Sequence, residues 1–136
     1  MEAFTALVKE YRGEVDRERL EKAIFEPGTV HAMIMISGEP VGFCLWYDTF
    51  STETCRKGIY LDSLYVREEL RGEGLGEIMF ENIARIAEMG GYERLEWKKD
   101  PEKKFFAGHA ADAPTVLRVE GIENITKLWG HCHCHE

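Results

Sequence analysis

The chain has no excess of basic residues. Its 136 residues include 17 Lys and Arg against 25 Asp and Glu, so the formal net charge is -8 at pH 7. A protein that binds nucleic acid needs a basic surface to neutralise phosphates, and this balance argues against that class. An acidic chain suits a cationic substrate such as an amine, but many proteins are acidic only because charge keeps them in solution.

Long hydrophobic runs are also missing. No segment approaches the roughly 18 consecutive apolar residues of a membrane span, and Met1-Glu2-Ala3-Phe4 does not begin a signal peptide. Without a leader, the four cysteines are expected to be reduced thiols. The hydrophobic and charged fractions, 44% and 31%, are ordinary for a globular protein. We therefore expect one domain, in the cytoplasm, with no membrane partner.

The most informative stretch that is present is Leu70-Arg71-Gly72-Glu73-Gly74-Leu75-Gly76. It lies between a strand-like segment, Ile59–Val66, and a helix-like segment, Glu77–Met89. Glycine lets the backbone approach a ligand closely and adopt positive φ. A helix that opens at the last glycine directs its unpaired N–H groups and the positive end of its dipole at the loop. These features predict an anion site.

Several interpretations of this loop compete. The plainest is an ordinary turn between a strand and a helix. A dinucleotide-binding loop follows the first strand of a parallel βαβ unit, whereas a predicted hairpin precedes this loop. A P-loop ends in Gly-Lys-Ser/Thr, whereas the chain here continues Gly76-Glu77-Ile78. Beside the ordinary turn, there remains an anion loop that begins with an arginine and carries no metal-binding hydroxyl.

Hydrophobic periodicity and turn residues predict an α/β fold with a mixed sheet. We expect an early antiparallel hairpin and a helix that crosses over between the third and fourth strands. That helix is expected to bury Ile78, Met79, Ile83, Ile86 and Ala87. The expected order is two helices, three strands, a helix, a strand, a helix and a strand. In chain order they cover Glu2–Tyr11, Asp16–Phe25, Thr29–Ser37, Val41–Phe50, Gly58–Val66, Glu77–Met89, Tyr92–Trp97, Pro101–Ala110 and Pro114–Glu120.

With these neighbours, the loop resembles that of the GNAT superfamily of acyl-CoA-dependent N-acetyltransferases. The family's loop is Gln/Arg-x-x-Gly-x-Gly/Ala, and Arg71–Gly76 fits it at every position. The preceding Ile59–Leu70 resembles the family's central strand, and the aromatic-rich Gly42–Tyr47 resembles a strand of the diamine/polyamine acetyltransferase branch. The resemblance is specific over Val41–Trp97. It implies a GNAT-like fold over residues 1–130, with the family's first strand missing.

The resemblance also implies a site for acetyl-CoA as co-substrate. The pyrophosphate would be held by the loop residues Arg71, Gly72, Glu73, Gly74, Leu75 and Gly76. The pantetheine arm would pair like an added strand with Leu64, Tyr65 and Val66, where the central strand splays from Tyr92–Trp97. One backbone N–H there would polarise the thioester carbonyl. A small-molecule amine, such as a polyamine, would attack directly, with no metal and no covalent enzyme intermediate.

Two acidic residues are candidates for the proton chemistry. An alkylammonium must lose a proton before it attacks, so a carboxylate near the amine is useful. Asp62 falls where the polyamine branch carries a glutamate that binds and deprotonates the substrate, and Ser63 falls on a second acidic position of that branch. Glu96, on the adjacent predicted strand, is the second catalytic candidate. Both acids could instead be solvated strand residues.

The sequence departs from the family late in the chain. The family often carries Pro-x-x-x-Phe-Tyr-x-x-x-Gly-Ala, and Pro101–Ala111 keeps this spacing with Phe106 at the tyrosine and Ala110 at the glycine. The hydroxyl that would protonate the leaving CoA thiolate is therefore absent. The segment between Trp97 and Pro101 is also too short for the usual asparagine that contacts CoA. These departures leave a non-catalytic acyl-CoA-binding or sensor protein as the alternative function.

Residues 131–136 form a separate tail that is dense in metal ligands, His131-Cys132-His133-Cys134-His135. Structural zinc sites draw ligand pairs from separated segments. A disordered terminus or a fortuitous chelator is therefore expected ahead of a metal-handling function. A homodimer is a further expectation, because a missing first strand leaves a sheet edge that a partner chain could cover.

Overall fold

The computed structural model describes residues 1–98, 113 and 118–134, with side chains described up to residue 128. The chain divides into two compact units, Met1–Phe105 and Phe106–Glu136. The sheet and all the residues predicted for the catalytic and co-substrate sites belong to the first unit.

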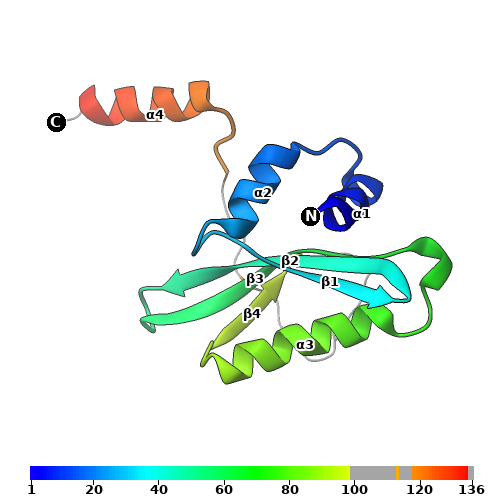
Figure 1. Ribbon diagram of the computed structural model, residues 1–136. Coiled ribbons are helices and arrows are strands. Elements are labelled where there is room, and N and C mark those ends of the chain that lie inside the picture. The colour runs from blue at the N-terminus through cyan, green and yellow to red at the C-terminus, as the bar shows by residue number, and fades with distance from the viewer. Residues whose placement is uncertain (99–112, 114–117, 135–136) are drawn as a thin grey trace. The chain divides into compact units, whose positions relative to one another are not determined.

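A four-stranded sheet runs through the first unit (Figure 1). Its strands are β1 (His31–Ser37), β2 (Glu39–Ser51), β3 (Arg56–Val66) and β4 (Arg94–Trp97), in that spatial order. The first three are antiparallel neighbours, and β4 pairs with β3 in parallel. The predicted mixed sheet is confirmed. Within the described residues β1 is an edge strand, and the homodimer inferred from such an edge stays a prediction.

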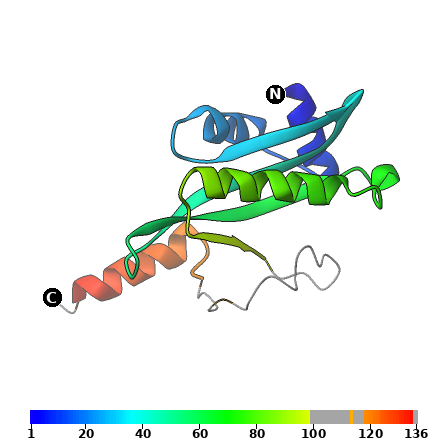
Figure 2. The same ribbon diagram turned by 90° about the horizontal axis from the view of Figure 1, so that it is seen from below.

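Helices cover both faces of this sheet (Figure 1 and Figure 2). α1 (Glu2–Arg12) and α2 (Arg17–Phe25) lie on one face, and α3 (Leu75–Met89) lies on the other. On the first face the ring of Phe4 meets the ring of Phe43 edge-on, with centroids 5.2 Å apart. On the second face Phe80 meets Trp97 in the same way at 4.9 Å. The core therefore has two layers, one on each side of the sheet.

The α1 side of the core is a cluster of buried residues around β2. Its members are Phe4, Leu7, Val8 and Phe43. The opposite side includes the fully buried Ile59, Met79 and Ile83. Cys44 lies within β2 with no exposed surface, and burial raises the pKa of its thiol to about 12. This thiol is a packing group and stays protonated at neutral pH.

Helix α3 differs from the prediction in its start and in its buried face. It begins at Leu75 rather than Glu77, with Gly74 as its N-cap. The face turned to the sheet consists of Gly76, Met79, Phe80 and Ile83, which follow the i, i+3, i+4, i+7 spacing of one helix face. Ile78 falls off this stripe and is 47% exposed, so the prediction that it is buried is wrong.

The later part of the chain is described only in pieces. The predicted helix Pro101–Ala110 and the first residues of the predicted strand Pro114–Glu120 lie outside the described residues. Residues 118–120 are described and are not in a strand. An unpredicted helix, α4 (Ile122–Cys134), follows. It gives residues 131–134 of the predicted disordered tail a helical backbone. Apolar residues at Ile122, Ile125 and Leu128 have the spacing of a helix, which is the signal for α4 in the sequence.

Among the described residues, no helix is both long and apolar enough to cross a membrane.

We expect Phe43→Ala to lower the free energy of unfolding by about 3–5 kcal/mol, because Phe43 is 1% exposed and its loss leaves a cavity. Denaturant unfolding measures this change. Phe50→Ala on the same strand is the matched control, since Phe50 is 63% exposed and should cost less than about 1 kcal/mol. Equal losses in the two variants would contradict the placement of the core.

Candidate active site

The glycine loop has the backbone that the sequence analysis expected. Gly72 and Gly74 have φ values of 90° and 79°, a region that side chains with a Cβ rarely adopt. No atom lies within 4 Å of the place where a Cβ on either glycine would stand. Positive φ therefore explains these two glycines, and open space at both leaves room for a ligand.

The N-terminus of α3 opens directly onto this loop. Its first intrahelical hydrogen bond runs from the Ile78 N–H to the Gly74 carbonyl at 3.1 Å. No side chain caps the helix. The N–H groups of Leu75, Gly76 and Glu77 precede that first bond and are free to donate to an anion. The exposed Glu77 carboxylate stabilises the helix dipole, but the donors themselves are backbone groups.

Arg71 ties the loop to the end of β3. Its Nε donates to the Val66 carbonyl at 2.9 Å, and its guanidinium lies 5.6 Å from the centre of the Tyr65 ring. Nearby, Arg67 pairs with Glu10 of α1 at 3.1 Å, and this hydrogen bond raises the pKa of Arg67. In the described structure Arg71 thus fixes the position at which the loop leaves the strand. A contact with phosphate would be a second role of this side chain.

The hydrogen-bond pattern of β3 determines which of its backbone groups face outward. The Arg67 N–H donates to the Val41 carbonyl at 2.9 Å, so these two residues form a hydrogen-bonded pair. Such pairs alternate with non-bonded pairs along an antiparallel ladder. The polar backbone groups of Tyr65 therefore face β2, and those of Leu64 and Val66 face the opposite edge.

That opposite edge of β3 is only partly covered. β4 pairs with β3 as far as Leu61 and Trp97 and no further. Beyond that point, within the described residues, only Arg71 Nε bonds to this edge, at the Val66 carbonyl. The N–H and carbonyl of Leu64 and the N–H of Val66 are left for an extended ligand. Two of the three residues predicted to pair with a pantetheine arm therefore present their backbone at the fork between the strands.

Asp62 is the extra residue of a β-bulge at the same fork. The register with β2 runs through Leu45–Ser63 and then jumps to Trp46–Leu61, which leaves Asp62 without an opposite residue. Bulges of this kind re-aim side chains and are frequent beside active sites. The Ser63 hydroxyl donates to Asp62 Oδ2 at 2.6 Å, so the Ser63 side chain orients the carboxylate. Asp62 is an exposed residue, and its open oxygen, Oδ1, has no hydrogen-bond partner among the described residues.

A row of side chains continues from Asp62 across the sheet. Tyr47, Tyr60 and Glu96 are register partners on three adjacent strands, and partner residues share a face. The two tyrosine rings lie 5.2 Å apart. Burial, then Tyr60, then the charge of Asp62 raise the pKa of Tyr47. Side chains two positions apart along a strand point to the same face, so Asp62, two residues after Tyr60 in β3, lies on the face of this row.

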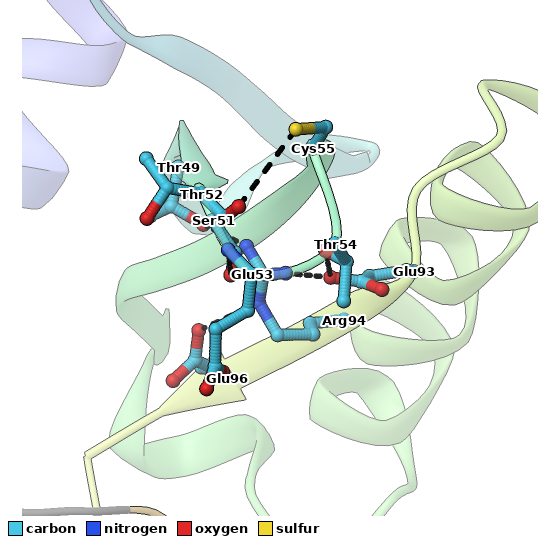
Figure 3. A network of polar contacts seen from close by, with 9 residues as sticks. All are labelled: Thr49, Ser51, Thr52, Glu53, Thr54, Cys55, Glu93, Arg94 and Glu96. Carbon is cyan, nitrogen blue, oxygen red and sulfur yellow. Dashed lines mark hydrogen bonds and ion pairs between the residues drawn. The ribbon is translucent and has the colours of Figure 1, made fainter.

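Figure 3 shows a polar network around Arg94 that has Glu96 at its end. Arg94 Nε lies 3.5 Å from Glu96 Oε1, and Arg94 Nη2 donates to Thr49 Oγ1 at 3.2 Å. Arg94 Nη1 also pairs with Glu93, whose Oε2 accepts from Thr54 Oγ1 at 2.5 Å. The network joins the turn between β2 and β3 to the start of β4. It therefore holds the strand that carries Glu96.

The structure brings most of the predicted site residues to the same part of β3. The loop Arg71–Gly76 follows the strand, Leu64 and Val66 lie on its open edge, and Asp62 is at the fork. Tyr65 instead turns its ring into the α1 side of the core, 5.5 Å from the ring of Tyr11. Phe106 and Ala110 lie outside the described residues. In the described part of the chain, no group of three or more His, Cys, Asp or Glu could hold a metal.

Comparison with known proteins agrees with this arrangement. The resemblance of the sequence to acyl-CoA-dependent N-acetyltransferases is confirmed by a family model. The model described as "Acetyltransferase (GNAT) family" matches residues 1–107. The chain belongs to this family, whose members use acetyl-CoA as co-substrate.

Individual relatives share part of the chain. It is 36% identical over 81 residues to a thialysine N-epsilon-acetyltransferase of Caenorhabditis elegans, covering 59% of this chain and 49% of that protein. It is 34% identical to the Bos taurus enzyme of that name over 76% of this chain and 59% of that protein. The chain thus spans about half the length of these relatives. A ribosomal-protein-alanine N-acetyltransferase from Brucella melitensis biovar Abortus 2308 has the same fold, with a TM-score of 0.72, 21% identity and coverage of 89% and 92%.

We expect Gly74→Glu to abolish most of the rise in melting temperature that acetyl-CoA produces, because it places bulk and negative charge at the cap of α3. Gly13→Glu is the control for a charged side chain at an open position, since Gly13 has a φ of 92° and open space around its Cβ position. Gly74→Glu should cost about 1–2 kcal/mol of stability, because Gly74 is in the left-handed helical region. Gly13→Glu should cost at least as much, because its ψ of -127° lies outside that region. An unchanged acetyl-CoA shift in Gly74→Glu would rule the loop out as the site.

Proposed function

We propose that this protein transfers the acetyl group of acetyl-CoA to a primary amine of a small cationic substrate by direct attack. One observation carries the proposal. The bulged Asp62 and the open strand edge lie in the second half of β3, and the glycine loop follows the end of this strand. A ligand that starts at the loop and follows the edge ends beside a carboxylate. That order matches an acyl donor with its phosphates at one end and its reactive thioester at the other.

The chain's own groups supply binding and orientation of the donor. The N–H groups of Leu75, Gly76 and Glu77 bind the pyrophosphate, and Leu64 and Val66 hold the pantetheine arm along the edge. Bound acetyl-CoA supplies the thioester carbon that accepts the amine. We assign the Leu64 N–H to the thioester oxygen, because it is the outward donor closest in sequence to Asp62. A donor aimed there stabilises the negative charge that develops on that oxygen.

Asp62 acts on the amine in this proposal. Its open oxygen accepts the ammonium proton, directly or through a water molecule, and leaves a lone pair on nitrogen for attack. The C–N bond forms, the C–S bond breaks and the CoA thiolate leaves, and the second proton that the nitrogen loses passes to the departing thiolate or to solvent. A thiolate is stable enough near neutral pH to leave without a dedicated acid. The reaction therefore does not depend on the tyrosine hydroxyl that Phe106 replaces.

We further propose a polyamine or similar diammonium compound as the acceptor. The thialysine acetyltransferases to which the chain is similar are named for a cationic amine substrate. The net charge of -8 and the exposed carboxylates beside the fork favour such a substrate. The non-catalytic acyl-CoA-binding protein is the alternative, motivated by Phe106 and by the short segment after Trp97.

Two measurements separate these functions. Acetyl-CoA should raise the melting temperature under both, and no shift would exclude both. We expect CoA release with a panel of diamines and amino acids that carry side-chain amines. Acetyl-CoA binding without CoA release for any amine of the panel would favour the sensor.

We expect Asp62→Asn to lower turnover by about 100-fold at pH 7, the range of a general base. The loss should be smaller at pH 9, because more of the amine is already neutral there. A pH–rate profile of both proteins measures this. Ser63→Ala is the control, since it removes only the hydroxyl that orients Asp62 and should keep the wild-type pH dependence. A loss in Asp62→Asn that is the same at all pH values would show that Asp62 positions the substrate rather than deprotonating it.

A further inference from the structure

We infer that Arg94 is a positioning residue that holds Glu96 as a second anionic contact, for a cationic group of the acceptor remote from the reacting amine. The inference rests on the proposed function and gives the two acids of the site different roles. Asp62 serves the amine that reacts, and Glu96 selects acceptors that carry a second positive charge.

Arg94 is held in one place by groups on three sides. Its guanidinium crosses directly over Gly58 of β3, and a Cβ on Gly58 would stand 2.7 Å from Arg94 Nη2 and 2.9 Å from Arg94 Nε. Thr49 of β2 accepts from Nη2 at 3.2 Å, and Glu93 pairs with Nη1. The arginine can lie across β3 at this point only because Gly58 has no side chain.

Glu96 receives only one contact from this arginine. Its Oε1 lies 3.5 Å from Arg94 Nε. The Arg94 side chain is 28% exposed and the Glu96 side chain is 39% exposed. One carboxylate oxygen is thus steered toward the network, while the group as a whole stays accessible to a ligand. An acid oriented in this way loses less conformational entropy when it binds a cation.

The two carboxylates of the network share one arginine, so the network as a whole carries a negative charge. Glu93 is the nearer partner of Arg94, and Thr54 Oγ1 donates to Glu93 at 2.5 Å. Glu93 and Arg94 therefore balance each other. With Glu96 added, the three groups carry one net negative charge. A half-exposed carboxylate with a net charge around it attracts an ammonium group.

The position of Glu96 relative to Asp62 fits an acceptor with two cationic groups. Glu96 is the register partner of Tyr60, and Asp62 follows Tyr60 by two residues. Strand geometry puts the two Cα atoms about 8 Å apart, from about 6.6 Å along β3 and about 4.8 Å across to β4. Tyr60 is the neighbour of both acids, since it pairs with Glu96 and precedes Asp62 by two residues. A short methylene chain can pass beside the Tyr60 ring with one ammonium group at each carboxylate.

Two acceptors with the same carbon chain test this inference, 1,4-diaminobutane and butylamine. In the wild type we expect the KM of the diamine to be lower by about tenfold, the size of one charged hydrogen bond. Glu96→Gln should raise the KM of the diamine to that of butylamine and leave kcat for both amines within twofold. Arg94→Gln should raise the KM of the diamine by a smaller factor, and Arg94→Lys should restore part of the loss. The double variant should be no worse than Glu96→Gln alone.

Glu81→Gln is the matched control, because it removes one exposed carboxylate from α3 on the other face of the sheet. It should leave both KM values unchanged. An equal effect of Glu96→Gln on both amines, or no effect, would overturn the inference. A pH-dependent fall in kcat would instead make Glu96 a base. Calorimetry can also measure the affinity of each amine for the protein–CoA complex, which requires no turnover. The role of Glu96 can therefore be tested even if the protein does not catalyse acetyl transfer, and failure of this inference is distinguishable from failure of the proposed function.

Discussion

The two edges of β3 are the constraint on which the site depends. One edge is bonded to β2 along almost the whole strand, and in the described part of the chain the other is bonded to β4 only as far as Leu61. A backbone group left without a partner in a protein interior is costly, so the unpaired half of β3 is stable only beside solvent or a ligand. The same strand then ends in the glycine loop. The unpaired backbone groups that leave the sheet incomplete at β3 are therefore the same groups that are available to a ligand.

The strand, the glycine loop and the helix that follows it could be predicted from the sequence. The sequence signals here are local: they are alternating glycines, the apolar strand before them and the amphipathic helix after them. Each of these patterns predicts the backbone conformation of its own residues. The positive φ values of Gly72 and Gly74 and the cap of α2 at Asp16 agree with what those residues predict by themselves. Asp62 and Glu96 were found through a family resemblance and through strand order rather than through any local signal.

The rest of the site depends on pairing between distant residues and could not be predicted from the sequence. The bulge at Asp62 exists only relative to the register with β2, and a single sequence does not contain a register. The polar network around Arg94 joins residues more than 40 positions apart in the chain, such as Arg94 and Thr49. Gly58 was the one available signal, because a glycine inside a strand suggests a close approach by another group. The buried face of α3 was misjudged at Ile78 for a related reason, since helix phase is set by the sheet below it.

The open half of β3 also bears on how the protein behaves in concentrated solution. Three outward backbone groups in a row, next to a strand of only four residues, form a template to which any extended peptide can add. A donor molecule seated along that edge would occupy the template. If the proposed donor site is correct, we therefore expect the empty protein to self-associate more readily than the protein with a donor bound.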